Sequence, residues 1–447
     1  MTTENRPQKT ENRLFSIVTF GCKVNQVDSA GLAQELGTLG WLPAPEGAAP
    51  ALILVNTCTV TARADQQARQ AIRRLARDHP GASLWVTGCY AQRAPAEVAA
   101  IPEVRTVLGN PEKARLAEFL GAWPGPGPRL SVGADLAAAP FHAWRLQSFP
   151  GHTRAWLKIQ DGCSHRCSYC IVPTVRGPRR SLAPGGVGTS LQELAVLNYQ
   201  EVVLTGVDLG QYGQDLTPPT GLAALVRRLR GRPWPFRVRL SSLEPQELTG
   251  ELLGELAGWG EFCRHFHLPL QSGASAVLAA MGRPYDPGDF RDLAAEIHRR
   301  FPDAGLGLDV LVGFPGETAA DFEATRDLVA SLPATYLHVF PFSPRPGTPA
   351  ARMAPLPAAE IRERARAMRD LGRAKKLQFL ESQLGQVREV LVEGPAPQRG
   401  WLKGLSDNYL RVVLPGPPQW RNRRLLVRFT SRRGEALLGE VVNGNRF

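Results

Sequence analysis

Three of the seven cysteines of this chain lie on one short stretch, Cys163-Ser-His-Arg-Cys167-Ser-Tyr-Cys170. Three thiolates on one tight loop can ligate three irons of a 4Fe–4S cube, whereas a closed cluster takes four cysteines. The fourth iron then keeps an open position, as catalytic metals do, so the spacing predicts a reactive iron–sulfur centre. The alternatives from the residues alone are a zinc site and three coincidental core cysteines. Zinc is disfavoured because it needs four ligands and no second cysteine pair follows.

The open iron of such a cluster suits the amino and carboxylate groups of S-adenosylmethionine (SAM). Electron transfer from the reduced cluster would then cleave the sulfonium to methionine and a 5′-deoxyadenosyl radical. We therefore expect Cys163, Cys167 and Cys170 to be the catalytic residues of the chain. Tyr169 is of the type that packs near an adenine, although simple core packing would explain it equally.

Other candidate SAM contacts follow the predicted strands of the same region. Gly206 and Asp208 could bind the SAM ammonium, and Gln271 and Ser272 lie where a ribose could be reached. Gly313 stands in a glycine-rich turn that would let the backbone approach a ligand closely. Each of these could instead be a plain turn residue, but they share one location, the carboxyl ends of predicted strands.

Three further cysteines, Cys22, Cys58 and Cys89, each follow a predicted strand. The strands are 14–20, 51–55 and 84–87, with helices such as 62–77 between them. Strands alternating with helices predict a parallel α/β sheet, in which functional groups gather at the carboxyl ends of the strands. These cysteines could therefore converge on one site, or they could be separate structural thiols.

The rest of the chain predicts two more domains. A Pro- and Gly-rich linker is expected at 123–140, and one long basic helix at 358–381. Between them we expect a partial (β/α)6 TIM-like barrel, with its active site at the carboxyl-end loops. Its predicted strands are 155–160, 201–205, 236–241, 265–270, 307–312 and 335–340, with helices such as 289–300 and 319–331. The tail reads as short strands separated by turns, typical of a small antiparallel β-barrel. The fold class is thus α/β with a C-terminal barrel, in domains 1–135, 141–381 and 382–447.

The 447-residue chain carries a net charge of +12, which favours polyanionic partners. Residues 382–447 hold eleven Lys and Arg against five Asp and Glu, and Trp401 or Tyr409 could stack on bases. The candidate phosphate contacts are Arg421, Arg423, Arg424, Arg428, Arg432 and Arg433. A solvated basic face is the alternative.

The bulk sequence indicates an ordinary globular protein outside the membrane. No apolar run approaches the roughly 20 residues that a membrane-spanning helix needs, and the N-terminus has no apolar core for a secretory signal. An odd cysteine count without such a signal argues against a disulfide framework. We expect a cytoplasmic protein, and since nothing indicates an obligate dimer, a monomer.

The motifs together resemble the methylthiotransferase family of radical SAM enzymes. They are TFGCKVNQVDS (19–29), VNTCTVTARAD (55–65), VTGCYAQ (86–92), KIQDGCSHRCSYCIVPTVRGPRRS (158–181), LSSLEP (240–245), HLPLQSG (267–273) and VGFPGET (312–318). The resemblance runs essentially end to end and includes a C-terminal TRAM-like domain. Asp208 departs from the pattern, because the family commonly has Asn there, and Leu182 stands where a basic residue is common.

This resemblance implies a three-domain enzyme with two 4Fe–4S clusters. Cys163, Cys167 and Cys170 would hold the cluster that cleaves SAM. Cys22, Cys58 and Cys89 would hold an auxiliary cluster whose free iron carries the sulfur to be inserted. One SAM would methylate that sulfur, and a second would yield the radical that activates the substrate C–H bond. Cys263 matches no ligand motif and is expected to be a buried structural thiol.

The sequence GCKVNQ around Cys22 resembles the MtaB branch of the family. That branch converts N6-threonylcarbamoyladenosine (t6A) at position 37, in the anticodon stem–loop of tRNA, to its 2-methylthio derivative. The partners implied are tRNA, a reductant that donates electrons and a source of sulfur. The rival readings are RimO-like action on a ribosomal protein, MiaB-like action on isopentenyladenosine, and a non-catalytic RNA-binding iron–sulfur protein. Two cysteine triads argue against the last, because binding alone needs no open iron.

Overall fold

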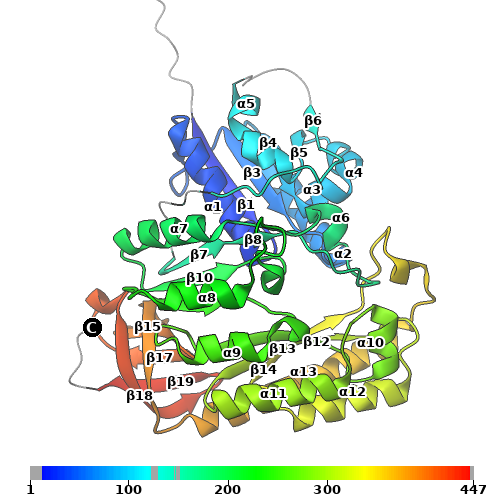
Figure 1. Ribbon diagram of the computed structural model, residues 1–447. Coiled ribbons are helices and arrows are strands. Elements are labelled where there is room, and N and C mark those ends of the chain that lie inside the picture. Colours follow the sequence, from blue (N-terminus) through cyan, green and yellow to red (C-terminus); the bar gives the residue numbers. More distant parts are fainter. Residues whose placement is uncertain (1–12, 122–128, 145, 147–148, 150–151, 443–447) are drawn as a thin grey trace, which may run out of the picture. The chain divides into compact units, whose positions relative to one another are not determined.

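A computed structural model describes residues 13–121, 129–144, 146, 149 and 152–442 (Figure 1). The chain divides into two compact units. Unit 1 comprises residues 1–144 and 174–176, and unit 2 comprises 145–173 and 177–447. Among the described residues, no helix has the length and apolarity that crossing a membrane requires.

Unit 1 is built on a six-stranded sheet in the order β2-β1-β3-β4-β5-β6, and every pairing in it is parallel. The strands are β1 (Leu14–Thr19), β2 (Leu42–Pro43), β3 (Leu52–Thr57), β4 (Ser83–Gly88), β5 (Val104–Leu108) and β6 (Arg129–Ser131). The helices are α1 (Lys23–Thr38), α2 (Ala62–Asp78), α3 (Cys89–Arg93), α4 (Pro95–Ala99) and α5 (Leu116–Leu120). The expected parallel α/β domain is therefore present.

Helices cover both faces of this sheet, because β3 is apolar on both sides. Ile53 and Val55 pack with α2, whereas Leu52 and Leu54 pack with α1 and α5. Continuous apolar strands of this kind are typical of parallel sheets buried on both faces. The result is a rigid sheet whose carboxyl ends carry the loops of interest.

Unit 2 begins with six parallel strands arranged as two three-stranded sheets, β11-β10-β7 and β12-β13-β14. Their bounds are β7 (Arg154–Lys158), β10 (Glu201–Thr205), β11 (Arg237–Leu240), β12 (His265–Gln271), β13 (Gly305–Val312) and β14 (Tyr336–Pro341). The helices of the region are α7 (Pro184–Val196), α8 (Leu222–Arg230), α9 (Gly250–Ala257), α10 (Ser275–Met281), α11 (Pro287–Arg300), α12 (Ala319–Ser331) and α13 (Ala358–Ser382). The short helix α6 (Val172–Arg176) is divided between the units, because residues 174–176 belong to unit 1. A short antiparallel pair joins β8 (Gln160–Asp161) to β9 (Arg180–Ser181). The predicted partial barrel of six βα units is confirmed.

Short 3-10 helices complete the loops: η1 (Pro111–Arg115), η2 (Leu209–Gln211), η3 (Pro245–Glu247), η4 (Pro349–Arg352) and η5 (Pro418–Trp420).

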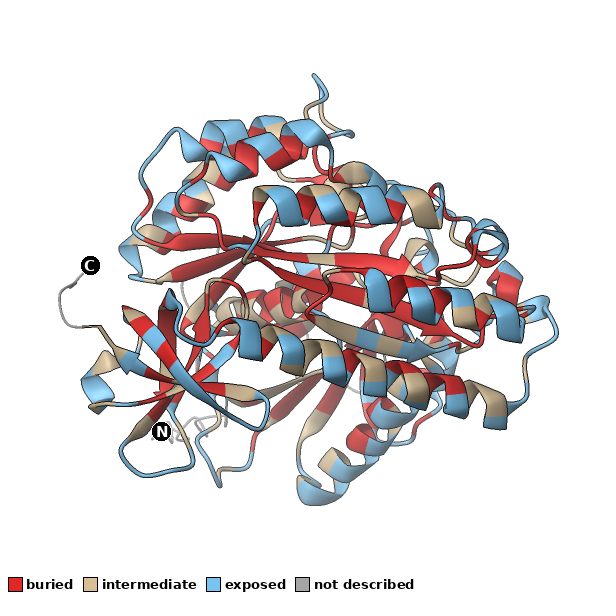
Figure 2. Ribbon diagram, turned by 90° about the horizontal axis from the view of Figure 1, so that it is seen from below, coloured by how far each residue is buried: buried red, intermediate tan, exposed pale blue. Residues whose placement is uncertain are grey.

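The burial of residues follows the layers of the fold, as Figure 2 shows. The strands are mainly buried, and along the helices buried residues alternate with exposed ones. This alternation is that of amphipathic helices on a sheet.

The tail folds as a closed barrel in the order β15-β16-β17-β19-β18. Its strands are β15 (Val387–Pro395), β16 (Trp401–Ser406), β17 (Arg411–Pro415), β18 (Arg424–Arg433) and β19 (Ala436–Val441). The expected small β-barrel is confirmed, although β17 and β19 pair in parallel rather than antiparallel fashion. The strand β16 was not among the predicted strands, because WLKGLS offers little apolar alternation.

Buried charged residues of β10 and β11 bind the C-terminal barrel. Glu201 is fully buried and forms ion pairs of 2.7 Å with Arg237 and 2.8 Å with Arg239. Arg237 also donates to the carbonyl of Leu405, and Arg239 to the carbonyl of Asp407, both in the barrel. Burial opposes ionisation of Glu201, yet Arg239 and Arg237 hold its pKa well below the usual range. A fully paired buried triad of this kind is costly to break on one side.

The predicted linker at 123–140 is partly wrong. Arg129–Ser131 form β6 and extend the sheet of unit 1 beside β5. The short strand carries little apolar signal, so its Pro- and Gly-rich surroundings dominated the prediction. Residues 122–128 lie outside the described part of the chain.

Candidate iron–sulfur sites

The first three cysteines lie at the carboxyl ends of adjacent strands in unit 1. Cys22 follows β1 after a short turn, and Cys58 and Cys89 follow β3 and β4 directly. Because β1 pairs with β3 and β3 with β4, the three loops meet at one edge of the sheet. A Cβ placed on Gly21 would lie 3.0 Å from the Sγ of Cys58, so the Cys22 and Cys58 loops touch.

Backbone geometry brings the thiols together. Gly88 has a φ of +96°, and a Cβ there would lie 2.4 Å from the carbonyl oxygen of Thr57. Only glycine allows this approach between the Cys89 and Cys58 loops. Burial raises the pKa of the Cys58 thiol to about 12, and the nearby thiols of Cys89 and Cys22 add to that rise.

Two asparagines tie the loops to each other. The Nδ2 of Asn25 donates to the carbonyl of Phe20 at 2.7 Å and to that of Thr57 at 3.0 Å. Asn56 donates in turn to the carbonyl of Asn25 and to the hydroxyl of Ser29. Buried amides that satisfy loop carbonyls fix those loops in one conformation. Both residues belong to the sequence motifs around Cys22 and Cys58.

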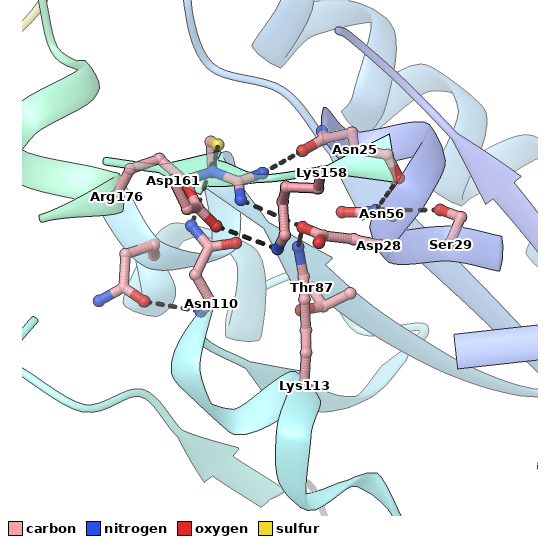
Figure 3. Close-up of polar contacts among 12 residues, drawn as sticks. Asn25, Asp28, Ser29, Asn56, Thr87, Asn110, Lys113, Lys158, Asp161 and Arg176 are labelled. Atoms are coloured by element: carbon pink, nitrogen blue, oxygen red, sulfur yellow. Dashed lines mark hydrogen bonds and ion pairs between the residues drawn. The ribbon is translucent and has the colours of Figure 1, made fainter. Parts of the chain in front are cut away.

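Figure 3 shows a buried charge network that includes Arg176, Asp28 and Lys113. The Nε of Arg176 lies 3.4 Å from the Sγ of Cys89, and its Nη1 lies 3.1 Å from the carboxylate of Asp28. Lys113 forms a second ion pair of 2.9 Å with Asp28, and burial lowers the pKa of Lys113. The Nδ2 of Asn110 approaches the same Sγ at 3.9 Å. A cation beside a thiol favours the thiolate, which is the form that binds iron.

These residues fit a cluster held by three cysteines. Cys58 and Cys89 are buried, while Cys22 is exposed, so one side of the site remains open. Three thiolates leave one iron of a 4Fe–4S cube without a protein ligand. The arrangement therefore suits an auxiliary cluster with an accessible iron.

The second cysteine triad lies in unit 2, in the loop after β8. The amide of Cys163 donates to the carbonyl of Gly177, and that of Cys170 to the carbonyl of Cys167. Gly162 has a φ of +74°, and a Cβ there would lie 1.9 Å from the carbonyl oxygen of Pro178. The loop is therefore folded tightly on itself at the carboxyl end of the first barrel strand.

Charged side chains surround these thiols. Burial, and then the carboxylate of Asp208 at 3.3 Å from its Sγ, raise the pKa of the Cys163 thiol. Arg283 donates to the Sγ of Cys167 at 3.2 Å and forms an ion pair with Glu244. Burial also raises the pKa of Cys170 to about 12. Binding iron at such thiols must displace their protons, so cluster assembly here is coupled to pH.

His165 joins two acids beside the same loop. Its Nε2 lies 3.2 Å from a carboxylate oxygen of Asp208 and 3.2 Å from one of Glu247. The bonds to Asp208 and then Glu247 raise the pKa of His165 to about 10, and burial raises that of Glu247 to about 8. The carboxyl oxygens of this group can accept hydrogen bonds from a ligand, such as the amino group of SAM.

The predicted SAM contacts occupy the loops expected for them. Asp208 is buried, and its amide donates a hydrogen bond of 2.8 Å to the Oε1 of Gln160, whose side chain packs against Gly206. Tyr169 packs against an apolar cluster that includes Phe314 and Phe342. The roles of Gly206, Asp208 and Tyr169 toward SAM stay predictions.

Gln271 is the last residue of β12 and Ser272 follows it, and the two differ in backbone conformation and burial. Gln271 has a φ of +63°, an unusual backbone conformation for a residue other than glycine. Ser272 is fully buried, and its hydroxyl pairs with Thr325 at 3.2 Å. Gly313, with a φ of +76°, packs against Ile361 and donates its amide to Glu317. Of these three, Gln271 is the one whose side chain is only half-buried.

The six predicted RNA-contacting arginines differ in exposure. Arg421, Arg423, Arg428, Arg432 and Arg433 are exposed on the C-terminal barrel, whereas Arg424 is half-buried. Arg424 pairs with Glu389 at 3.4 Å and donates to the carbonyl of Pro235, so it has a structural role.

Tyr409 differs from the expectation that it could stack on bases, because its ring stacks on that of His265 with centroids 4.2 Å apart. It is therefore not a free stacking platform.

Sequence reasoning missed the residues that support the thiols. Arg176 and Arg283 contact Cys89 and Cys167, and Asn110 approaches Cys89, from distant parts of the chain. Of these three residues, only Arg176 lies in one of the family motifs, the segment 158–181 that contains the second cysteine triad. Cys263 is fully buried with a pKa raised to about 12 by burial, in agreement with a structural thiol.

Each cysteine triad lies in a segment of the chain that matches a known family. Residues 14–109 match the "Uncharacterized protein family UPF0004", and residues 157–329 match the "Radical SAM superfamily". Among solved structures, the radical SAM methyltransferase TsrM from Kitasatospora setae is similar, with a TM-score of 0.54 and 16% identity. The match covers 76% of this chain and 77% of that one, and it shows the shared fold.

The most informative relatives are curated tRNA-modifying enzymes. The threonylcarbamoyladenosine tRNA methylthiotransferase MtaB of Thermotoga maritima is 34% identical over 402 residues, covering 90% of this chain and 91% of the relative. The MtaB of Bacillus subtilis is 34% identical, covering 89% of each chain. The tRNA-2-methylthio-N(6)-dimethylallyladenosine synthase of Moorella thermoacetica is 33% identical, covering 97% of this chain and 99% of the relative. The chain therefore belongs to the methylthiotransferase family of radical SAM enzymes.

Proposed function

We propose that this protein is a SAM-dependent tRNA methylthiotransferase that acts on C2 of t6A at position 37. The observation that carries the proposal is the presence of two cysteine triads, one at the carboxyl ends of three parallel strands and the other on the loop that follows the first barrel strand. One triad suffices for cleaving SAM, so the second implies a further task, which is to hold the sulfur that is transferred.

Cys163, Cys167 and Cys170 would hold the cluster that, when bound, supplies the electron for reductive cleavage of SAM. The chain's own residues prepare this site. Arg283 holds the Cys167 sulfur, and Glu244 neutralises Arg283. The carboxyl oxygens of Asp208 and Glu247 would accept hydrogen bonds from the amino group of SAM.

Cys22, Cys58 and Cys89 would hold the auxiliary cluster in unit 1. Its open side, next to the exposed Cys22, would leave room for a sulfur ligand. Arg176 and Asn110 contact the Cys89 sulfur and would stabilise its charge when iron is bound. The reaction also needs an electron donor and a sulfur source, which other molecules of the cytoplasm would supply to a monomeric enzyme.

The proposed substrate rests on two supports. Several MtaB relatives share 32–35% identity with most of the chain, and GCKVNQ at Cys22 resembles that branch. The exposed arginines of the C-terminal barrel suit tRNA phosphates. Action on dimethylallyladenosine is a second candidate, because synthases of that type are 32% and 33% identical over comparable lengths.

The test is anaerobic reconstitution of the chain with iron, sulfide, SAM and a strong reductant, followed by incubation with tRNA that carries t6A. Mass spectrometry of the digested nucleosides should detect the 2-methylthio derivative of t6A. Active SAM cleavage with an unmodified base would contradict the substrate assignment.

A further inference from the structure

Four polar side chains of unit 2 form a hydrogen-bonded chain, one from the loop after β11 and one from each of the strands β12, β13 and β14. The Oγ of Ser242 lies 2.6 Å from the Nδ1 of His267, whose Nε2 lies 2.9 Å from the Oδ1 of Asp309. The same oxygen lies 3.2 Å from the Nδ1 of His338. Three of the four imidazole nitrogens are thus engaged, and in the described part of the chain the Nε2 of His338 has no hydrogen-bond partner.

This cluster faces the interior of the partial barrel. On the opposite face of β12, Phe266 packs on Phe301 at the end of α11, with ring centroids 5.1 Å apart. On the opposite face of β14, Leu337 packs against Gly372 of α13. Because side chains alternate along a strand, His267 and His338 point away from the helices.

The cluster lies between the base of the barrel and the Cys163–Cys170 loop. Two residues before His267 along β12, the ring of His265 is covered by Tyr409 of the C-terminal barrel. Two residues after Ser242 comes Glu244, which pairs with the Arg283 that contacts Cys167. The side chains of this cluster can therefore contact a substrate that binds in the barrel beside the cysteine loop.

Because β14 is the edge strand of its three-stranded sheet, His338 also borders a pocket of about 360 Å³ at that edge, which residues of α13 and of the C-terminal barrel complete. Its charged lining residues are Arg369, Arg373, Lys376, Arg411 and Glu435. Glu435 lies 2.7 Å from Lys376, so the acid is already neutralised. Within the residues that the structure describes, Arg369 and Arg411 form no ion pair, so the pocket has an excess of positive charge and suits an anion.

An exposed aromatic ring stands beside His338. Phe340 lies two residues further along β14, on the same face, and is 41% exposed. Its ring centroid is 6.4 Å from that of His338. Exposed aromatic rings of this kind are common stacking platforms for nucleic-acid bases. A purine on Phe340 could reach His338 with a substituent on its edge.

We propose that Phe340 and His338 form the recognition site for the modified adenine, with Phe340 stacking on the base and His338 binding the carboxylate of the threonylcarbamoyl group. This inference rests on the proposed function. The Nδ1 of His338 is engaged by Asp309, so an imidazole that carries both protons has its Nε2–H left to donate to the carboxylate. Arg369 and Arg411 add positive charge around the bound carboxylate.

The site would also explain a preference among adenosines. An isopentenyl group has no hydrogen-bond acceptor, so placing it here would leave the polar nitrogen of His338 and the cationic pocket without a partner. Sites that hydrogen-bond a substrate group reject analogues that lack it, because their own polar atoms are left unpaired. A phosphate of the RNA backbone is the other anion that could enter the pocket, and the test separates the two.

The experiment measures binding of anticodon stem–loop RNAs to the full chain with reconstituted clusters, by anaerobic fluorescence anisotropy. The RNAs differ only at position 37, which carries t6A, unmodified adenosine or isopentenyladenosine. The variants are His338→Ala and His338→Gln, with His298→Ala on the exposed side of α11 as the matched control.

The native chain should bind the t6A RNA roughly tenfold more tightly than the adenosine RNA, the worth of one charge-assisted hydrogen bond. His338→Ala should remove this preference, His338→Gln should retain part of it through its amide donor, and His298→Ala should leave it unchanged. An unchanged preference in His338→Ala would overturn the proposal, and equal weakening of all three RNAs would assign the pocket to backbone phosphate instead. Failure of the native chain to methylthiolate any of these RNAs would count against the proposed function itself, whereas normal product with an unaltered preference would count against this site alone.

Discussion

The Nε of Arg176 lies 3.4 Å from the Sγ of Cys89, although the two residues are 87 positions apart in the chain. Arg176 also pairs with the buried carboxylate of Asp28. The guanidinium therefore links the cysteine loop after β4 to helix α1, and it places a fixed positive charge on a sulfur that must be a thiolate to bind iron.

Arg176→Ala should weaken assembly of the auxiliary cluster. Without the guanidinium, the Cys89 thiolate loses a cationic partner, and Asp28 loses one ion pair while its ion pair with Lys113 remains. In a background that lacks the thiols of Cys163, Cys167 and Cys170, iron bound per chain after reconstitution should fall several-fold. Arg176→Lys should restore part of it, because a lysine keeps the charge but not the planar geometry.

The control for this change is Arg115→Ala, which removes an exposed arginine of unit 1 whose contacts are local, an ion pair with Glu118 and a cation–π contact with Phe119. Its iron content should match that of the background protein. If Arg176→Ala also kept full iron content, the contact with Cys89 would have no role in cluster binding.

The two triads should separate by function. Cys167→Ala should abolish SAM cleavage, because the cluster that donates the electron loses a ligand. Cys58→Ala should spare SAM cleavage but stop sulfur insertion. Measuring the amounts of 5′-deoxyadenosine and of methylthiolated nucleoside in the same reaction distinguishes these outcomes. Continued sulfur insertion by Cys58→Ala would refute the role assigned to the auxiliary cluster.

Gly88→Ala should disturb the Cys89 loop. The residue has a φ of +96°, and its added Cβ would lie 2.4 Å from the Thr57 carbonyl oxygen. The strained backbone and the clash should together lower the free energy of unfolding by about 1–3 kcal/mol and reduce cluster content. Gly37→Ala in the exposed last turn of α1, where no atom lies within 4 Å of the new Cβ, should instead be neutral or slightly stabilising. Urea unfolding of the two variants measures both changes, and equal effects would be inconsistent with the loop geometry.

Asp309 should make stability depend on acid pH. Burial alone would raise its pKa, but hydrogen bonds from His267 and His338 lower it to about 2. A carboxyl whose pKa is depressed on folding stabilises the protein above its unfolded pKa, and this contribution is lost as pH falls from about 4 to about 2. The native chain should therefore lose about 2 kcal/mol relative to Asp309→Asn over that window, measured by denaturant unfolding of cluster-free protein. A difference between the two proteins that does not vary with pH would show that the carboxylate is not held by its histidines.

The sequence predicted the positions of the cysteines well, for a physical reason. Strand-end placement is a local property, and parallel strands bring their carboxyl ends to one edge whatever their order. Cys22, Cys58 and Cys89 could thus be grouped before the order β1-β3-β4 was known. Long amphipathic helices such as α12 and α13 were equally predictable, because their periodicity extends over many residues.

The supporting residues could not be predicted in the same way. Arg283 contacts Cys167 from 116 positions away, and Tyr409 turns inward onto His265 from the C-terminal barrel. Contacts of this kind depend on how elements pack, and no local pattern marks them. The same is true of His338, which becomes a candidate only when β13 places Asp309 beside it.

The central claim is that this chain methylthiolates t6A in tRNA, and a competition assay tests it most directly. Equal amounts of two anticodon stem–loops, one with t6A and one with isopentenyladenosine at position 37, would be incubated in one tube with the reconstituted chain, SAM and reductant. Mass spectrometry of the nucleosides should find the methylthio group predominantly on t6A. Methylthiolation predominantly of isopentenyladenosine, or of neither base while SAM is cleaved, would contradict the account.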